Sequence, residues 1–276
     1  MPSRLDHSPS CMWPPNDRPA SSQCWARVTP SEDAGLSHGA HMHEGEWSSR
    51  LGIPGMPAEA EELMVHRDIV LGRLTNAPVH FLHLSTAGSV QLVREAKARG
   101  LRVTAEAAPH HFTLTHAEVA SYDPVFKVNP PLRTDADVEA VKAGLADGTI
   151  DAIATDHAPH AQELKESPFD EAPCGMLGLE TALSLALTQL GLPIERVLAL
   201  LSWQPARIAG VDTGPVEAGR PANLCVVDPS HQWTVDPARL ASRSRNTPYA
   251  GRSMTGKVRH TVYKGEVVVL DGEAQR

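Results

Sequence analysis

Short β-prone runs alternate with helix patterns through the middle of the chain, and this alternation restricts the fold more than any other feature. The β-prone runs are residues 79–84, 102–108 and 150–155. The helix patterns around them are residues 57–74, a segment that ends at Gly100, residues 137–148 and residues 178–191. Strands that are joined in sequence by helices form parallel βα units. The sequence therefore predicts an α/β fold with a parallel sheet.

Apolar residues repeat at helical spacing in three of these segments, and each repeat predicts an apolar face. In residues 57–74, Pro57 stands in the first turn and Glu59, Glu61 and Glu62 lie near the positive end of the helix dipole. The apolar positions predicted to share a face are Leu63, Val70 and Leu74 in the first helix, Val90, Val93 and Ala96 in the second, and Leu179, Leu183, Ala186 and Leu190 in the last.

The character of the chain changes twice along its length. Residues 1–30 combine Pro, Ser, Trp and Cys with no period of 2 or 3.6, so we expect an irregular segment there. Residues 31–213 carry the βα pattern. From residue 214 to 276 the chain has short β-rich pieces at 222–228, 257–265 and 266–272, the last two arranged as a hairpin. These boundaries predict a small β unit appended to an α/β core.

Composition narrows the classes of partner. The chain is 41% hydrophobic and 21% charged, with a formal net charge of −8 and no block of Lys or Arg, so nucleic acid and anionic lipid are not expected partners. No apolar stretch approaches the roughly 20 residues of a membrane helix. The four cysteines lie far apart and form no CxxC pair, which suits a reducing cytoplasm. We expect a cytoplasmic protein that acts on a small molecule.

Polar residues follow each of the three β-prone runs. They are His83 after the first, Glu106 with His110 and His111 after the second, and Asp156 with His157 and His160 after the third. Side chains at the carboxyl ends of parallel strands share one face, and imidazole with carboxylate suits Zn²⁺. For His83 taken alone, a hydrogen-bonded histidine without a metal is the more common case. For His110 and His111, beside Pro109, a role in the turn or behind the site is favoured over direct ligation.

Several longer motifs occur together with these residues. VHFLHLSTAGS, TAEAAPHHFTLT, KVNPPLR (127–133), DAIATDHAPH, GMLGLET (175–181) and SRSRNTPYAG (242–251) follow one another in an order and spacing that resemble class I dihydroorotase, of the amidohydrolase superfamily. The resemblance runs from about residue 31 to the C-terminus. It implies a (β/α)₈ barrel with a small β-sandwich, and the reversible conversion of N-carbamoyl-L-aspartate to dihydroorotate in pyrimidine biosynthesis. It also implies two zinc ions in an intact site.

The resemblance implies roles for six residues. Asp156 matches the aspartate that binds metal and shuttles the proton from a zinc-bridging hydroxide to the leaving nitrogen, and His83 matches a zinc ligand. Asn129 matches the asparagine that contacts the substrate ring, and His160 a residue that holds the substrate carboxylate. Cys174 and Gly175 match a loop whose backbone faces the substrate.

The chain also departs from the family pattern. The family's first barrel strand ends in His-x-His and Arg, and a bridging acidic or carboxylated lysine ligand comes from mid-barrel; neither has a counterpart. Pro30 stands at the position of a histidine ligand, and His41-Met42-His43 resembles a loop after the fifth strand with no strand before it. Only three of eight barrel strands are recognisable. We therefore expect an N-terminally truncated, partial barrel that keeps the C-terminal strands and is weakly active or inactive.

Two other functions stay open. The first is a non-catalytic remnant or scaffold that supports an aspartate transcarbamoylase partner or assembles as a homo-oligomer. The second is a hydrolase of the allantoinase or hydantoinase type, which shares the TDH strand end. The NPPLR motif and the second histidine of TDHAPH argue against the latter.

Overall fold

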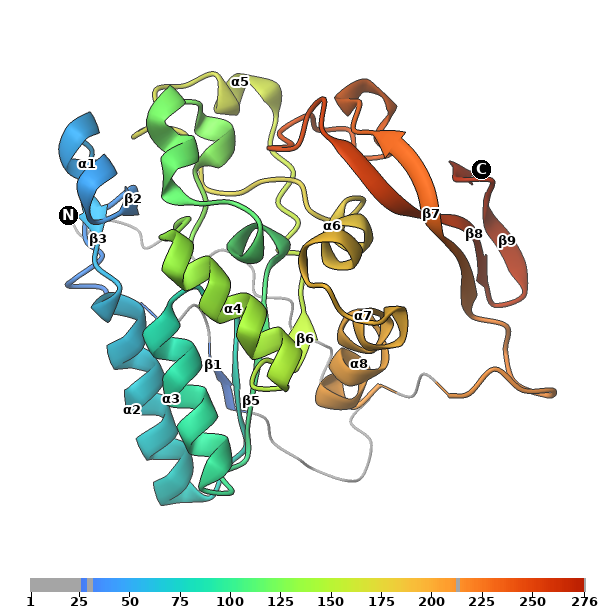
Figure 1. Ribbon diagram of the computed structural model, residues 1–276, viewed down its shortest axis with the longest axis horizontal. Coiled ribbons are helices and arrows are strands. Elements are labelled where there is room, and N and C mark those ends of the chain that lie inside the picture. Colours follow the sequence, from blue (N-terminus) through green and yellow to red (C-terminus); the bar gives the residue numbers. More distant parts are fainter. Residues whose placement is uncertain (1–25, 29–31, 212–213, 276) are drawn as a thin grey trace, which may run out of the picture.

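The computed structural model describes residues 26–28, 32–211 and 214–275, and Figure 1 shows their arrangement. The strands are β1 (Ala26–Val28), β2 (Met42–His43), β3 (Gly55–Met56), β4 (Val79–Phe81), β5 (Val103–Ala107), β6 (Ala152–Ile153), β7 (Leu224–Thr234), β8 (Ser253–Tyr263), β9 (Glu266–Leu270) and β10 (Glu273–Ala274). The α-helices are α1 (Glu46–Leu51), α2 (Glu59–Thr75), α3 (Ala87–Ala98), α4 (Asp135–Asp147), α5 (Gln162–Lys165), α6 (Ala182–Gln189), α7 (Ile194–Leu201) and α8 (Trp203–Ala209). Short 3₁₀ turns lie at Pro109–Phe112, His116–Ser121, Pro124–Phe126 and Pro237–Arg239.

A parallel sheet forms the centre of the α/β part, as the alternation predicts. Its strand order is β1-β4-β5-β6, and every neighbouring pair is parallel. The connecting helices α2, α3 and α4 lie side by side in chain order along one face of this sheet (Figure 1). Because the strands are parallel, β4, β5 and β6 present their carboxyl ends at the same edge.

One carboxylate organises the start of two of these helices. Asp137 forms a capping box with Thr134 at the N-terminus of α4, accepting the Thr134 backbone N–H at 3.1 Å and its hydroxyl at 2.6 Å. The other oxygen of Asp137 accepts the backbone N–H of Ala87, the first residue of α3, at 2.8 Å. Helix α4 ends at Gly148, whose φ of 85° lies in the left-handed region that favours glycine.

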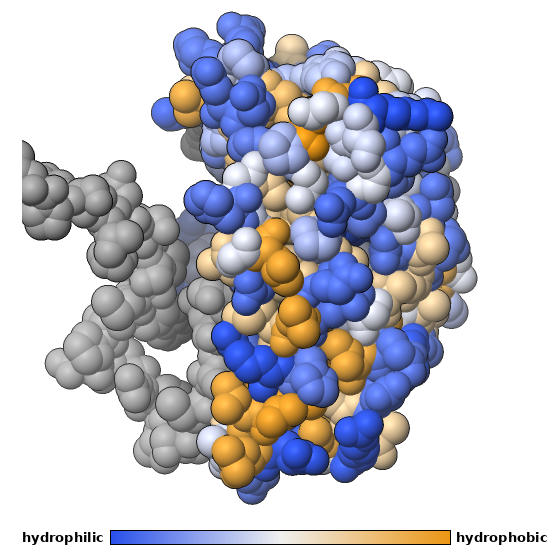
Figure 2. All heavy atoms as spheres, turned by 90° about the vertical axis from the view of Figure 1, so that its left-hand side faces the viewer, coloured by the Kyte–Doolittle hydropathy of each residue, from blue (hydrophilic) through white to orange (hydrophobic). Residues whose placement is uncertain are grey.

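The apolar face predicted for α2 is exposed, whereas the face predicted for α3 is buried. Val90, Val93 and Ala96 are buried in α3. In α2 the predicted positions point outward: exposed hydrophobic residues of this helix are Leu63 (55%), Val70 (38%), Leu71 (48%) and Leu74 (79%). The side that packs on the sheet carries Ala60, Val65 and Ile69 together with two buried acids, Glu61 and Asp68. Figure 2 shows hydrophobic side chains gathered on the face of the molecule that α2 presents.

The last predicted helix is shorter than its sequence pattern. Helix α6 begins at Ala182, so Leu179 lies before it and is exposed. Of the predicted face, Ala186 is fully buried, and Leu183 and Leu190 are partly buried against the same core cluster. Between β6 and α6, residues 157–176 include the one-turn helix α5.

A second, antiparallel sheet of order β10-β9-β8-β7 follows the helices, and it confirms the predicted β-rich C-terminal part and its hairpin. Helix α6 packs on β8. The Ser184 hydroxyl and the Trp233 indole N–H both donate to the carbonyl of Gly256, at 2.6 Å and 3.0 Å. Gly256 has a φ of 92°, in the left-handed region that favours glycine, and a side chain there would also lie 2.5 Å from Cδ1 of Leu187.

Two expectations for the N-terminal part need correction. The segment expected to be irregular contains β1, which pairs in parallel with β4, so the parallel sheet has four strands in the described residues rather than three. The rest of residues 1–30 lies outside the described residues. His41-Met42-His43 also differs from expectation, because Met42–His43 is itself a short strand paired with Gly55–Met56, and β1 precedes it. Within the described part of the chain, no helix is long and apolar enough to cross a membrane.

Candidate active site

Three of the residues predicted at strand ends meet at the carboxyl edge of the parallel sheet. His83 follows β4, Glu106 lies near the end of β5 and Asp156 follows β6. The His83 ring lies between the two carboxylates: Nδ1 is 3.2 Å from Oε1 of Glu106, and Nε2 is 3.6 Å from Oδ1 of Asp156. The geometry therefore brings together an imidazole and two acids from three different strands.

The backbone is unusual at both ends of this contact. His83 has a φ of 51° and Asp156 a φ of 45°, which place two residues with side chains in the left-handed region. Such conformations cost free energy and persist where the surrounding structure holds them. At His83 the hold is visible, because the next residue, Leu84, donates its backbone N–H to the carbonyl of Glu106 at 2.9 Å. The turn after β4 is thereby attached to β5.

Glu106 is fixed by a second imidazole. Its Oε2 lies 3.1 Å from Nε2 of His80, whose Nδ1 lies 2.8 Å from the hydroxyl of Thr104. His80 lies on β4 and His83 follows it, and both rings approach the one Glu106 carboxylate on β5. Nδ1 of His83 is buried with no hydrogen-bond partner among the described residues, so its approach to Glu106 is a close contact only, and Nε2 lies on the side of Asp156.

The environment of Asp156 favours its protonated form. Burial raises the pKa of its carboxyl group most, the His83 imidazole opposes that rise, and the Glu106 carboxylate adds to it. The side chain still exposes 28% of its surface. An acid that is partly buried yet reachable can accept a proton from a bound molecule and return it.

The described residues supply two candidate zinc ligands, fewer than a catalytic zinc site uses. Two atoms bound to one tetrahedral ion at about 2.0–2.1 Å lie about 3.3–3.4 Å apart, close to the separation of His83 Nε2 and Asp156 Oδ1. However, residues 32–211 and 214–275 contain no group of three or more His, Cys, Asp or Glu side chains placed to hold a metal ion. Catalytic zinc sites use three protein ligands. Pro30, which stands at an expected ligand position, lies outside the described residues. The described set alone does not fit a catalytic zinc ion.

His160 and the loop at Cys174 and Gly175 contact each other. Nε2 of His160 lies 2.8 Å from the carbonyl oxygen of Cys174, which requires a proton on that nitrogen. Gly175 has a φ of 127°, and a Cβ there would lie 2.5 Å from Cβ of Ala158. Only glycine lets this loop pack against residues 158–160. Burial raises the pKa of the Cys174 thiol, and the nearby Lys127 and Lys165 oppose this rise.

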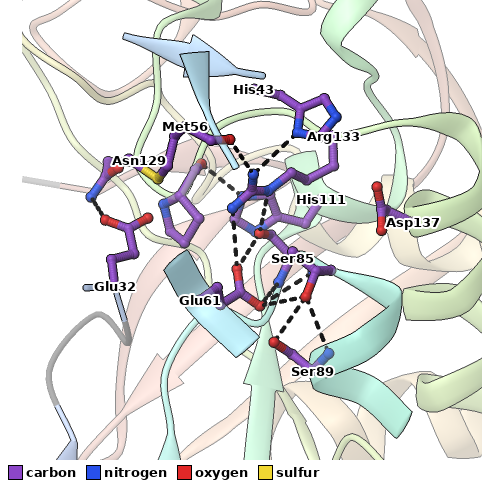
Figure 3. A network of polar contacts seen from close by, with 12 residues as sticks. Glu32, His43, Met56, Glu61, Ser85, Ser89, His111, Asn129, Arg133 and Asp137 are labelled. Atoms are coloured by element: carbon purple, nitrogen blue, oxygen red, sulfur yellow. Dashed lines mark hydrogen bonds and ion pairs between the residues drawn. The ribbon is translucent and has the colours of Figure 1, made fainter. Parts of the chain in front are cut away.

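Asn129 lies in the 127–133 loop and is held by an acid that the sequence did not single out. Its side-chain amide donates to Oε2 of Glu32 at 2.9 Å (Figure 3). The other oxygen of Glu32 is buried and has no hydrogen-bond partner among the described residues. Burial raises the pKa of Glu32, and the hydrogen bond from Asn129 opposes that rise.

The other histidines named from the sequence lie behind these groups. His110 and His111 are fully buried, and Nε2 of His111 donates to the carbonyl of Pro130 at 3.0 Å. His157 accepts from the backbone N–H groups of Gly178 and Leu179 at 3.3 Å each. His43 lies 3.1 Å from a guanidinium nitrogen of Arg133. These contacts organise the loops around the site.

Four residues around the site make contacts that the sequence did not indicate. Asn246 accepts from the His160 backbone N–H at 3.3 Å and donates to the carbonyl of Ala158 at 2.9 Å. Glu32 holds Asn129, while Glu61 and Arg133 form a buried pair behind His83. Asn246 and Arg133 lie inside motifs that were quoted, but their partners are distant in sequence and no local pattern indicates them.

Comparison with known proteins places the fold. The model of the amidohydrolase family matches residues 41–268. The structure superposes on L-hydantoinase from Arthrobacter aurescens with a TM-score of 0.75 and 28% sequence identity, covering 80% of this chain and 51% of that one. Dihydropyrimidinase from Brevibacillus agri NCHU1002 gives a TM-score of 0.74 at 23% identity, over 79% of this chain and 50% of that one, and so supports the fold alone.

Curated relatives are more similar in sequence. A dihydroorotase of Pelotomaculum thermopropionicum is 53% identical over 249 residues, and one of Streptomyces coelicolor is 51% identical over 250 residues. Each match covers 88% of this chain and 58% of the relative, so the chain spans less than two thirds of the length of these curated relatives. The family model alone covers well over half of the residues. On that match and on the shared α/β architecture, this chain is a member of the amidohydrolase family.

Proposed function

We propose that the chain carries dihydroorotase-type chemistry, the reversible conversion of N-carbamoyl-L-aspartate to dihydroorotate. The observation that supports this most is the meeting of His83 and Asp156 across two strand ends in a chain that is about half identical to proteins named dihydroorotase. Breaking or closing a cyclic amide requires a proton to leave one atom and reach another, and a partly buried carboxylate suits that task.

In this proposal Asp156 is the proton carrier. It accepts the proton of the attacking water and delivers it to the ring nitrogen that leaves. Its side chain is 28% exposed and lies next to His83, so it is within reach of a bound molecule. His83, with Nδ1 next to Glu106, presents Nε2 on the Asp156 side and is the proposed metal ligand.

The proposed substrate contacts come from the neighbouring loops. Asn129 would contact the ring amide, with its own amide oriented by Glu32. His160 would hold the substrate carboxylate, next to the backbone of Cys174 and Gly175. Both dihydroorotate and N-carbamoyl-L-aspartate are anionic, so hydrogen-bond donors in a chain of net charge −8 would have to act locally.

Zinc is the proposed metal of an intact site, where it would polarise the amide carbonyl and activate water. This chain supplies two proposed ligands, His83 and Asp156. The described residues contain no group of three or more side chains placed to hold a metal ion. We therefore propose that the chain alone has no activity or only trace activity.

The proposed architecture is a partial (β/α)₈ barrel at residues 31–213 with a small β-sandwich remnant at 214–276. The four-stranded parallel sheet with helices on one face supports the first part, and the four-stranded antiparallel sheet supports the second. The boundary at residue 214 falls next to residues 212–213, between α8 and β7. Within this proposal the setting is a reducing cytoplasm, consistent with free thiols at Cys174 and Cys225.

A non-catalytic role is the second candidate, and the short ligand set favours it. In that case the chain would act as a scaffold, through self-association or with an aspartate transcarbamoylase. A hydantoinase-type activity is less well supported, because the similarity to solved hydantoinases is 28% at TM-score 0.75, against 53% for a curated dihydroorotase.

Ligand binding and turnover of the full chain test the proposal separately. Ligand-observed NMR should detect dihydroorotate in preference to hydantoin or allantoin, and Asn129→Ala should weaken the dihydroorotate signal. Preference for hydantoin would overturn the assignment of substrate. Assays in both directions with added zinc should give trace turnover at most. Turnover like that of a full-length relative, lost in Asp156→Asn, would support the chemistry and contradict the predicted impairment.

A further inference from the structure

A buried pair of charges lies directly behind the turn that carries His83. Glu61 of α2 and Arg133 of the 127–133 loop are 1% and 2% exposed, and Nη2 of Arg133 lies 3.7 Å from Oε2 of Glu61. Both contact Ser85, two residues after His83, as Figure 3 shows.

Glu61 holds the backbone of the turn. Its Oε1 accepts the N–H of Ser85 at 3.0 Å and the N–H of Thr86 at 3.2 Å, and its Oε2 accepts the hydroxyl of Ser85. Charged acceptors form stronger hydrogen bonds than neutral ones, and these donors are almost completely buried. The carboxylate therefore fixes the two residues that follow His83 and Leu84.

Arg133 connects the same turn to a different loop. Its Nε donates to the Ser85 hydroxyl at 3.1 Å, while Nη1 donates to the Met56 carbonyl at 3.0 Å and to Nδ1 of His43 at 3.1 Å. Arg133 is four residues after Asn129 in the 127–133 loop. His111 also holds this loop, by donating to the Pro130 carbonyl. A displacement of the Asn129 loop would therefore be transmitted to Ser85.

We infer that Glu61 and Arg133 are positioning residues, which lock the His83 turn and the Asn129 loop to each other through the Ser85 hydroxyl. The inference rests on the proposed function insofar as His83 and Asn129 are site residues. Such positioning is needed because His83 has a left-handed backbone, a conformation that persists only where contacts on both sides hold it. Leu84 supplies the restraint toward β5, and Glu61 supplies the restraint toward α2.

The variants for the test each alter one side chain of the network. Glu61→Gln keeps the shape but removes the negative charge and one acceptor oxygen, and Ser85→Ala removes only the shared hydroxyl. Asp151→Asn is the matched control. Asp151 also pairs with a cation, Lys97 at 2.6 Å, and accepts a backbone N–H, from Ala105 at 2.9 Å, but it precedes β6 and its side chain has no described hydrogen bond to His83, Ser85 or Asn129.

The measurement is NMR of the full chain with labelled histidine rings, together with amide hydrogen exchange. We expect Glu61→Gln to shift the ring signals of His83, assigned by their loss in His83→Gln, and to speed exchange at Ser85 and Thr86 by about tenfold or more. Ser85→Ala should shift the ring signals of His83 and the side-chain amide signals of Asn129. Asp151→Asn should change none of these, whatever its effect on the melting temperature.

Unchanged signals of His83 in both Glu61→Gln and Ser85→Ala would overturn the inference, and so would equal changes in Asp151→Asn. If Glu61→Gln does not fold, Ser85→Ala decides the outcome alone. No readout uses substrate or turnover, so the result stands apart from the tests of the proposed function. If the chain fails to bind dihydroorotate yet shows the expected shifts, the proposed function is refuted, and the positioning role of Glu61 and Arg133 stands.

Discussion

Nε2 of His83 lies 3.6 Å from Oδ1 of Asp156, although the two residues follow different strands, β4 and β6, with β5 between them. The contact crosses the middle strand at the edge where Glu106 also lies. Metal binding tests it directly. We expect zinc to bind weakly in isothermal titration calorimetry, with fewer than two tightly held ions per chain, because the described residues offer only two ligands.

His83→Ala and Asp156→Ala should each weaken that binding further, because each removes one of the two ligands. His66→Ala, at an exposed position on α2, is the control and should leave it unchanged. Two tightly bound zinc ions in the wild-type chain would contradict the prediction.

Acid should destabilise the protein through its buried histidines. Burial lowers the pKa of His111 to about 3 and that of His43 to about 4, and it lowers the pKa of His110 well below the usual value. The unfolded chain takes up protons below about pH 6.5, whereas the folded chain does not until much lower pH. The free energy of unfolding should therefore fall as pH drops from about 6.5 toward 4, by up to about 1.4 kcal/mol per pH unit for each such histidine.

Urea unfolding at a series of pH values measures this slope. His111→Gln keeps a donor for the Pro130 carbonyl and should reduce the slope between pH 6.5 and 4. His66→Gln, on the exposed side of α2, should not. Equal slopes in the wild-type chain and His111→Gln would refute this origin of the acid sensitivity.

The two sides of α2 should respond oppositely to substitution. Ile69→Ala removes a side chain that packs in the core cluster with Val65 and Phe81, and should cost about 2–5 kcal/mol of unfolding free energy. Leu74→Glu changes an outward-facing residue that is 79% exposed and should cost little. Urea denaturation gives both values. A large loss in Leu74→Glu would show that this face is covered in solution, and light scattering of the two proteins would then reveal self-association.

Gly175→Ala should destabilise the loop beside His160 by about 1–3 kcal/mol, from the left-handed backbone and from a contact of 2.5 Å with Cβ of Ala158. The double variant Gly175→Ala with Ala158→Gly removes that contact and keeps the backbone strain, so it should recover part of the loss. Thermal unfolding of the three proteins checks this. Full stability of Gly175→Ala would mean that the loop has room to move.

The alternation of strand and helix was sufficient to predict the parallel sheet, because each unit is local in sequence. The pattern could not indicate β1, a three-residue strand among Pro and Ser residues whose existence depends on pairing with β4. It also could not indicate that the apolar side of α2 faces outward. Periodicity reports where apolar residues gather on a helix, but in α2 the side that packs on the sheet carries Glu61 and Asp68, which a hydrophobic pattern treats as solvent-facing.

The sequence predicted the meeting of His83, Glu106 and Asp156 for a simple reason: parallel strands bring their carboxyl ends together whatever the details of packing. The surrounding hydrogen bonds could not be predicted in this way. Glu61 looks like a residue that complements the dipole of α2, and only the folded chain shows that it accepts donors from Ser85 and Thr86. Asn246 and Glu32 likewise have partners from distant parts of the sequence.

The N-termini of α3 and α4 depend on the same carboxylate, that of Asp137. One of its oxygens serves the first N–H of α3, and the other closes the capping box of α4. Neither helix can fray at its N-terminus without weakening the electrostatic support of the other. The first turns of both helices should therefore open as one cooperative unit, with a shared opening free energy in native-state hydrogen exchange, although the helices are separate segments of the chain.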